Sequence, residues 1–161
     1  LGHRRIGTIT GPLNMPGASD RLAGYRQAMK AHRLPVDDEL IVEGDFAEES
    51  GMAAARRLLS LPVTAIFAAS DIMAVGALKV IRETDQRVPR DVALVGFDDV
   101  PIAAALQPAL TTVRQPIEQM GTMAASLLLS LLESPPEGRP PAQRLVLPAK
   151  LVVRESCGAL Q

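Results

Sequence analysis

The segment Val88–Asp99 constrains the fold more than any other part of this 161-residue chain. Pro89 is typical of a loop, and Val92–Val95 is a continuous apolar run of the kind found in strands that are covered on both faces. Two carboxylates, Asp98 and Asp99, follow at the end of this run. Ligands collect beyond the carboxyl ends of strands in open parallel sheets. The sequence therefore predicts that these carboxylates stand where a polar small molecule would bind.

The rest of the chain alternates between short apolar runs and helical periodicity. We expect strands at 5–10, 40–42, 64–69, 92–97 and 111–114, helices at 19–32, 48–60, 71–84 and 117–133, a proline-rich loop over 134–141, and terminal strands at 144–147 and 149–153. Repeated β-α units imply a parallel sheet with right-handed crossovers and helices on both faces. The predicted fold class is α/β with a doubly wound parallel sheet.

Composition and motifs argue against several classes of function. The net charge is −1 and the arginines are scattered, which argues against a nucleic-acid surface within this chain. Gly7 and Gly11 lack the spacing of a dinucleotide fingerprint, and no Walker lysine is present. Neither His3 nor His32 has metal-ligand spacing with Cys157. We therefore expect no cofactor, no metal and no enzymatic activity, and no apolar run reaches membrane-spanning length.

Five segments, taken in order along the chain, share one family pattern: Gly17–Tyr25, Ala68–Leu78, Val88–Asp99, Pro108–Pro116 and Leu147–Ser156. They resemble the lactose/galactose-repressor (LacI/GalR) family of transcription regulators. The resemblance implies a periplasmic-binding-protein-like type I sensor fold, of which this chain is mainly the C-terminal lobe. It implies that residues 1–115 and 143–161 belong to that lobe, that 116–142 belong to the N-terminal lobe, and that a helix-turn-helix domain lies outside this chain.

Arg21 and Asp98 are the first candidates for effector binding. A guanidinium can grip paired hydroxyls, a carboxylate or a base edge, and the matching arginine of the family binds effector. In the first turn of a helix a cation opposes the dipole; the alternative for Arg21 is a solvated side chain or a partner for Asp20. Asp98 can accept hydrogen bonds from hydroxyl or ring N–H groups, and the family places an effector-binding acid here. Its alternative, a helix cap or turn former, fits Asp99 better.

Phe46 is the aromatic candidate. It lies in a strand-to-helix loop, whereas Tyr25, Phe67 and Phe97 lie in periodic elements and are expected in the core. A flat ring suits stacking on the apolar face of a sugar or on a base, and the matching family position lines the cleft. The alternative is a hydrophobic plug over the next helix.

Three further residues complete the candidate effector site. Ser70 can bind ligand while Asp71 caps the following helix, although Ser70 is an equally good cap. Gln115 lies where the family's chain crosses between lobes, and its amide can both donate and accept; the alternative is a surface hinge residue. Met15 lies in the first loop and can touch the effector.

The helix expected at 117–133 carries an apolar stripe that the resemblance assigns to the first lobe. We expect this stripe to pack on another copy or on the rest of the protein. Val75, Leu78 and Leu106 match positions that form the dimer seam in relatives; ordinary core is their alternative. A homodimer is expected, because such regulators read two half-sites.

The resemblance thus implies the ligand-sensing domain of a cytoplasmic LacI-type regulator, a repressor that binds a small effector. A sugar or sugar derivative is the first choice of effector and a purine the second. Operator DNA would be bound only through the helix-turn-helix outside this chain. The alternative is a periplasmic-type sugar-binding protein of an ABC transporter, and a doubly wound enzyme is a third hypothesis that no catalytic constellation supports.

Overall fold

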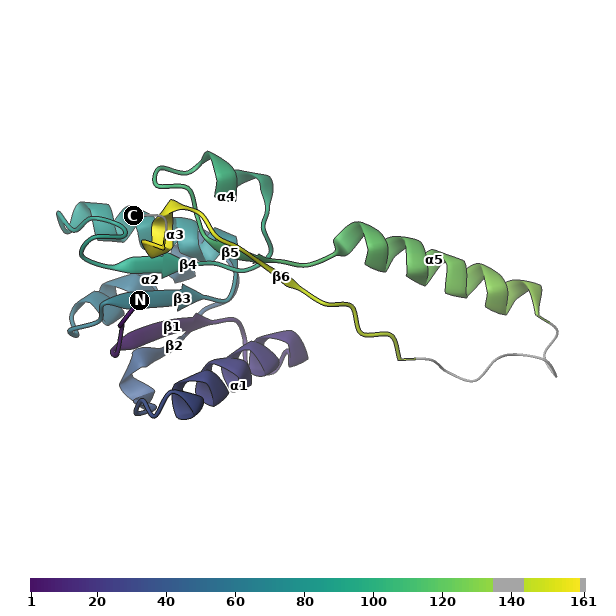
Figure 1. Cartoon of the computed structure of the whole chain (residues 1–161), viewed down its shortest axis with the longest axis horizontal. Coiled ribbons are helices and arrows are strands. Elements are labelled where there is room, and N and C mark those ends of the chain that lie inside the picture. The colour runs from purple at the N-terminus through teal and green to yellow at the C-terminus, as the bar shows by residue number, and fades with distance from the viewer. Residues whose placement is uncertain (135–143, 160–161) are drawn as a thin grey trace.

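The computed structural model of the chain describes residues 1–134 and 144–159 (Figure 1). Strands and helices alternate, as the sequence predicts. The strands are β1 (Ile6–Thr10), β2 (Ile41–Glu43), β3 (Ala65–Ala68), β4 (Ala93–Val95), β5 (Thr112–Arg114) and β6 (Lys150–Val152), and the α-helices are α1 (Pro16–Ala31), α2 (Glu48–Leu59), α3 (Asp71–Glu83), α4 (Pro101–Ala105) and α5 (Ile117–Glu133). Short 3-10 helices lie at Asp38–Leu40 and Glu155–Cys157.

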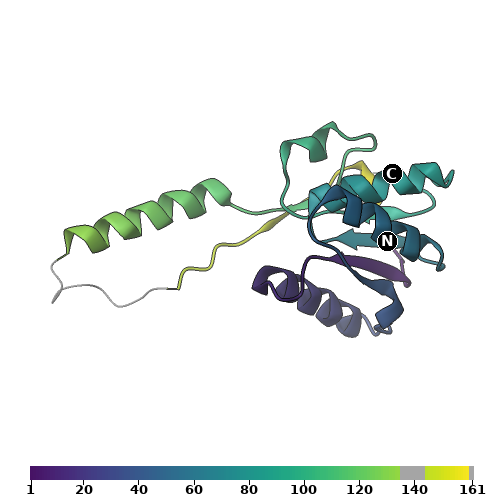
Figure 2. The same cartoon turned by 180° about the vertical axis from the view of Figure 1, so that it is seen from behind.

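The first four strands form one parallel sheet in the order β2-β1-β3-β4. Helix α1 covers one face of this sheet, and α2 and α3 cover the other (Figures 1 and 2). Strands β5 and β6 pair with each other in antiparallel fashion, and isolated parallel bridges link β4 and its following loop to β5. Helices on both faces of a parallel sheet confirm the predicted doubly wound α/β class.

The larger of the two core clusters lies between the sheet and the α2–α3 pair, and a smaller one lies under α1. Ile66 and Leu94 from the strands and Leu58 from α2 are at most 1% exposed. The two helices approach closely because a glycine of one lies against the backbone of the other: a Cβ atom added to Gly76 of α3 would lie 2.1 Å from the carbonyl oxygen of Glu48 in α2. This packing fixes the N-terminus of α3 at the same rim of the sheet as the loops that follow β1 and β4.

Helix α5 is set apart from this packed region. It projects away from the sheet at the end of the β5–β6 pair (Figure 1), and none of its residues is buried. Six of its large apolar side chains are exposed by 38–70%, namely Ile117, Met120, Leu128, Leu129, Leu131 and Leu132. The expected uncovered apolar stripe is therefore present. None of the helices in residues 1–134 and 144–159 is both long and apolar enough to span a membrane.

Some predicted boundaries are wrong. Helix α1 begins at Pro16, three residues before the predicted start, because proline is preorganised for the first helical position. Arg21 consequently lies in the second turn of α1, not in the first.

Helix α4 is a helix that the sequence does not predict. Residues 144–147 do not form the predicted strand: they run beside α5, with which they line a hollow, so the strand has no partner to pair with. The proline-rich loop expected at 134–141 lies outside the described residues apart from Ser134.

Candidate functional site

The candidate site lies at the carboxyl rim of the sheet, where α1 meets the loop after β4. Nη2 of Arg21 lies 3.6 Å from Oδ1 of Asp98. This separation is too long for a hydrogen bond, so each group keeps hydrogen-bonding capacity for a third molecule. The two side chains are only 19% and 28% exposed, and their charges therefore interact in a partly desolvated place. The structure brings the predicted guanidinium and carboxylate to one spot.

Two aromatic rings flank Arg21. Its guanidinium carbon lies 4.0 Å from the ring centroid of Phe97 and 5.9 Å from that of Phe46. Both distances are within the range of cation–π attraction, which orients the planar guanidinium. The sequence predicts Phe46 at the site but assigns Phe97 to the core, and the structure corrects the assignment of Phe97. Its position carries a signal for this, because Phe97 directly precedes Asp98 at the end of the strand.

The place of Phe46 depends on a glycine across the rim. A Cβ atom added to Gly11, which follows β1, would lie 2.0 Å from Cζ of Phe46. Phe46 itself adopts a positive φ of 70°, a strained conformation for a side chain of this size. The ring is therefore held in the loop by its contact with the β1–α1 connection. Phe46 also packs against the α2–α3 core, as the hydrophobic-plug alternative predicts. The plug and the ring beside Arg21 are therefore compatible descriptions of this one side chain.

Asp98 is held by contacts next to β5. We call β5 and β6 the crossover strands, because the chain runs through them to α5 and back. Nε2 of Gln115 donates a 2.8 Å hydrogen bond to its Oδ1, and the backbone N–H of Asp98 donates to the carbonyl of Val113. Burial raises the pKa of the Asp98 carboxyl, while the Gln115 hydrogen bond and the positive charge of Arg21 oppose this rise. Gln115 is thus placed at the site as predicted, in contact with the candidate carboxylate.

Asp99 has a different part from its neighbour. Its carboxylate pairs with Arg114 on β5 at 2.5 Å and with Arg154 after β6 at 2.6 Å, and its side chain is only 5% exposed. Burial by itself would raise the pKa of Asp99, but hydrogen bonds and charge from the two arginines bring it below its usual value. Asp99 therefore ties the loop after β4 to both crossover strands, a contact that neither sequence-based interpretation of Asp99 included.

Ser70 and Met15 differ in their burial and in the contacts that they make. Ser70 is the N-cap of α3: its hydroxyl accepts a hydrogen bond from the backbone N–H of Met73, and the residue is 4% exposed. The structure thus confirms the capping interpretation of Ser70, and a contact of Ser70 with ligand stays a prediction. Met15 directly precedes α1 and is 48% exposed, so its side chain is free to contact a molecule above the rim.

The three predicted dimer residues are covered to different degrees. Val75 and Leu78 of α3 are 6% and 3% exposed within one chain, because α3 packs against α2 and the sheet. Their low exposure in a single chain favours the core alternative, and their place in a dimer seam stays a prediction. Leu106, after α4, is half-buried against the same core.

Two hollows adjoin the candidate site. One, of about 470 Å³, lies between Phe97, Gln115 and the α5 residues Met120 and Met123. The other, of about 550 Å³, is lined by Asp98, Asp99 and Arg114 and by the start of α5. Phe97, Asp98 and Gln115 therefore border hollows that extend toward α5, whereas Arg21 and Phe46 line neither of these two.

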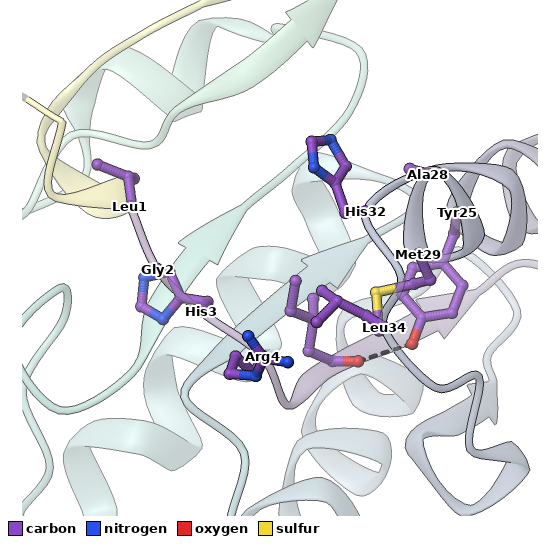
Figure 3. A pocket seen from close by; sticks show the side chains of 10 residues that line it. Leu1, Gly2, His3, Arg4, Tyr25, Ala28, Met29, His32 and Leu34 are labelled. Atoms are coloured by element: carbon purple, nitrogen blue, oxygen red, sulfur yellow. Dashed lines mark hydrogen bonds between the residues drawn. The ribbon is translucent and has the colours of Figure 1, made fainter.

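A further hollow of about 470 Å³ lies away from these residues, between the start of the chain and α1 (Figure 3). Its lining is mainly apolar, with Arg4 and His32 among its polar residues. The Tyr25 hydroxyl donates to the carbonyl of Ile6 (Figure 3), and His3 is hydrogen-bonded to Thr64. In the described parts of the chain, no three His, Cys, Asp or Glu residues cluster in a way that could hold a metal ion. The chemistry that can recognise a polar molecule is concentrated at the Arg21–Asp98 rim.

Comparison with known proteins gives a consistent result. The family model for a periplasmic binding protein-like domain matches residues 1–157. The regulator CelR of Thermobifida fusca is 47% identical over 157 residues, which are 96% of this chain and 45% of that protein. The repressor PurR of Klebsiella pneumoniae is 41% identical over the same shares of the two chains.

Solved structures agree with the sequence relatives. A structure of the regulator CelR in complex with cellobiose has a TM-score of 0.90 at 47% identity, covering 96% of this chain and 47% of that one. A Lac repressor structure bound to ONPG has a TM-score of 0.87 at 31% identity, covering 96% and 46%. The chain thus spans about half the length of the proteins it matches.

The fold and the matches define a periplasmic-binding-protein-like ligand-sensing domain of α/β class. Within that class, the chain belongs to the LacI family of transcription regulators and corresponds to the C-terminal effector-binding part of its members.

Proposed function

We propose that this chain is the effector-sensing C-terminal lobe of a LacI-family repressor, and that its effector is a small sugar. Arg21 and Asp98 orient the sugar hydroxyls, and Phe46 and Phe97 present flat ring faces beside them. The convergence of these four side chains at one rim is the observation that carries the proposal. Donors, acceptors and aromatic faces in alternation are what a polyhydroxylated ring requires.

Cellobiose is the first candidate among sugars. The relative whose structure is described as a complex with cellobiose is 47% identical to this chain, above the 31% of the Lac repressor. The names of the relatives also favour a regulator over the transporter-associated binding protein considered as the alternative.

Helix α5 and the crossover strands connect effector binding in this lobe to the rest of the regulator. We assign residues 116–142 to the other lobe of the sensor, with 1–115 and 143–161 in the lobe described here. The apolar surface of α5 would then be covered by that other lobe, and the sugar would lie between the two. Effector binding would favour one angle between the lobes, with about 1–3 kcal/mol of coupling to operator binding. The regulator would act in the cytoplasm as a homodimer that holds operator DNA through helix-turn-helix domains outside this chain.

The test uses the full-length regulator that contains this chain, bound to its operator. Cellobiose, maltose and a purine base are titrated separately, and operator release and binding heat are recorded in parallel. Release or tightening with cellobiose alone is expected. Binding of the purine base alone would overturn the sugar assignment, and an absence of heat with every compound would overturn the proposed class of effector.

A further inference from the structure

Asp71, the first residue of α3, is a fully buried carboxylate that the candidate site does not use directly. It is 0% exposed, and it is not the helix cap, because the neighbouring Ser70 caps α3. Burial raises the pKa of Asp71, and its hydrogen bonds oppose that rise only in part. A buried charge with neutral partners is costly to folding, so the position of Asp71 depends on the hydrogen bonds that this carboxylate accepts.

The hydrogen bonds of Asp71 hold both ends of the loop after β4. Its backbone N–H donates to the carbonyl of Phe97 at 2.8 Å, and its Oδ2 accepts from the backbone N–H of Val100 at 2.9 Å. Its Oδ1 accepts from the hydroxyl of Thr112 on β5 at 2.6 Å. One residue therefore joins the N-terminus of α3, the loop 97–100 and the first crossover strand.

The loop held in this way has an unfavourable backbone. Asp98 has a φ of 113° and Asp99 a φ of 59°, conformations that L-residues rarely adopt. Strain of this kind persists only where surrounding contacts determine the conformation. The fit is tight, since a Cβ atom added to Gly96 would lie 2.2 Å from Oδ1 of Asp71.

The direction of the Asp98 side chain depends on this backbone. In the observed conformation its carboxylate faces Arg21 and accepts from Gln115. We propose that Asp71 is a positioning residue of the effector site, which holds the loop 97–100 in the strained conformation that aims Asp98 at the ligand. This role rests on the proposed function only where ligand affinity is concerned, because the conformation of the loop can be measured without ligand.

The experiment combines hydrogen–deuterium exchange of peptides covering 97–100 with cellobiose titration, on the full-length regulator and its variants. Asp71→Ala removes both side-chain bonds, and the loop amides should exchange about tenfold faster while affinity falls about tenfold. Asp71→Asn keeps an acceptor for the Val100 N–H, and its amide can donate to the Thr112 hydroxyl. It should therefore restore slow exchange and most of the affinity.

A second pair of variants covers the case in which Asp71→Ala does not fold. Thr112→Val removes one donor to Asp71 and should speed exchange at 97–100, whereas Thr8→Val, an equally buried threonine of β1, should leave that segment unchanged. Equal exchange in Thr112→Val and Thr8→Val, or wild-type exchange in a folded Asp71→Ala, would overturn the positioning role. If the wild type binds no sugar but the exchange pattern appears, the sugar assignment fails and the positioning role stands.

Discussion

Helices α3 and α5 show how differently two apolar helices of one chain can be used. Nine of the 13 residues of α3 are buried, whereas none of the 17 residues of α5 is. Helix α3 follows a strand of the main sheet, and the short connection makes it pack on that sheet. Helix α5 follows β5, which leads away from the sheet toward the end of the molecule (Figure 2). Apolar content by itself does not bury a helix; the strand that leads into it decides what it can reach.

The candidate site lies at the boundary between these two regions. Arg21 and Phe46 come from the packed lobe, and Gln115 comes from the crossover that leads to α5. A ligand that contacts Asp98 therefore contacts a loop that is hydrogen-bonded to the crossover strand through Val113. Under the proposed function, a small molecule at this boundary would contact both the packed lobe and the strands that lead to α5.

The largest expected effect separates the two regions directly. Leu94→Ala in the packed lobe should lower the free energy of unfolding by about 2–5 kcal/mol, because Leu94 is 0% exposed and leaves a cavity. Leu128→Ala on α5, where the side chain is 58% exposed, should cost less than about 0.5 kcal/mol in the 161-residue chain. Urea denaturation of both variants measures the difference.

The same pair also tests whether α5 is covered in the full-length regulator. There Leu128→Ala should cost about 2 kcal/mol or more, since the other lobe would bury the leucine. A cost that stays as small as in the 161-residue chain would mean that α5 is exposed in the full-length regulator as well.

The next effect lies within the site. In Gly11→Ala the new methyl group would occupy the place of the Phe46 ring, and the ring must move. We expect a loss of about 1–3 kcal/mol in unfolding free energy from overpacking, and weaker sugar binding, measured by denaturation and calorimetry. Gly24→Ala in α1 is the matched control, because its Cβ would meet nothing within 4 Å. If Gly11→Ala bound sugar as tightly as Gly24→Ala does, Phe46 would have no part in the site.

The smallest effect is a pH dependence of sugar affinity. In the proposed complex the ionised Asp98 accepts hydrogen bonds from the sugar, and burial raises the pKa of this carboxyl above the usual aspartate value. As pH falls, Asp98 is protonated earlier than an exposed aspartate, so affinity is complete at neutral pH and declines by up to about tenfold per pH unit below this raised pKa.

The control for the pH experiment is Asp98→Asn, which lacks the titrating group but keeps an acceptor. The charged groups that face Asp98 are Arg21 and Asp71, and of these only Asp71 also titrates in the acidic range with a raised pKa. Calorimetry over a pH series should show a decline in the wild type and a flatter profile in Asp98→Asn. Parallel profiles would mean that Asp98 does not contact the sugar.

The sequence predicted the order of elements and the meeting of Arg21, Phe46, Asp98 and Gln115, since strand ends in a parallel sheet share one rim. It could not predict the backbone after β4. The positive φ angles of Asp98 and Asp99 turn adjacent carboxylates to different partners, one toward Arg21 and the other toward two arginines. Strand periodicity assigns Phe97 to the core, whereas the end of the strand exposes its ring to Arg21.

Two further differences have local causes. Asp71 reads as a helix-start residue, and its part in holding the loop depends on Thr112, which is 41 positions away in the sequence. The segment 144–147 has the apolar residues of a strand, but it lies beside α5 without a strand to pair with. In both cases the outcome depends on a segment distant in the chain, β5 for Asp71 and α5 for 144–147, and the local sequence does not indicate that contact.

The most direct test of the convergent site is calorimetric titration of cellobiose into the full-length regulator and two arginine variants. Arg21→Ala removes the guanidinium between the two rings, while Arg26→Ala removes an exposed arginine of α1 that pairs with Asp38. Affinity should fall by about a hundredfold in Arg21→Ala, as expected for the loss of charge-assisted hydrogen bonds, and stay at the wild-type value in Arg26→Ala. Equal affinity in all three proteins would contradict the assignment of this rim as the effector site.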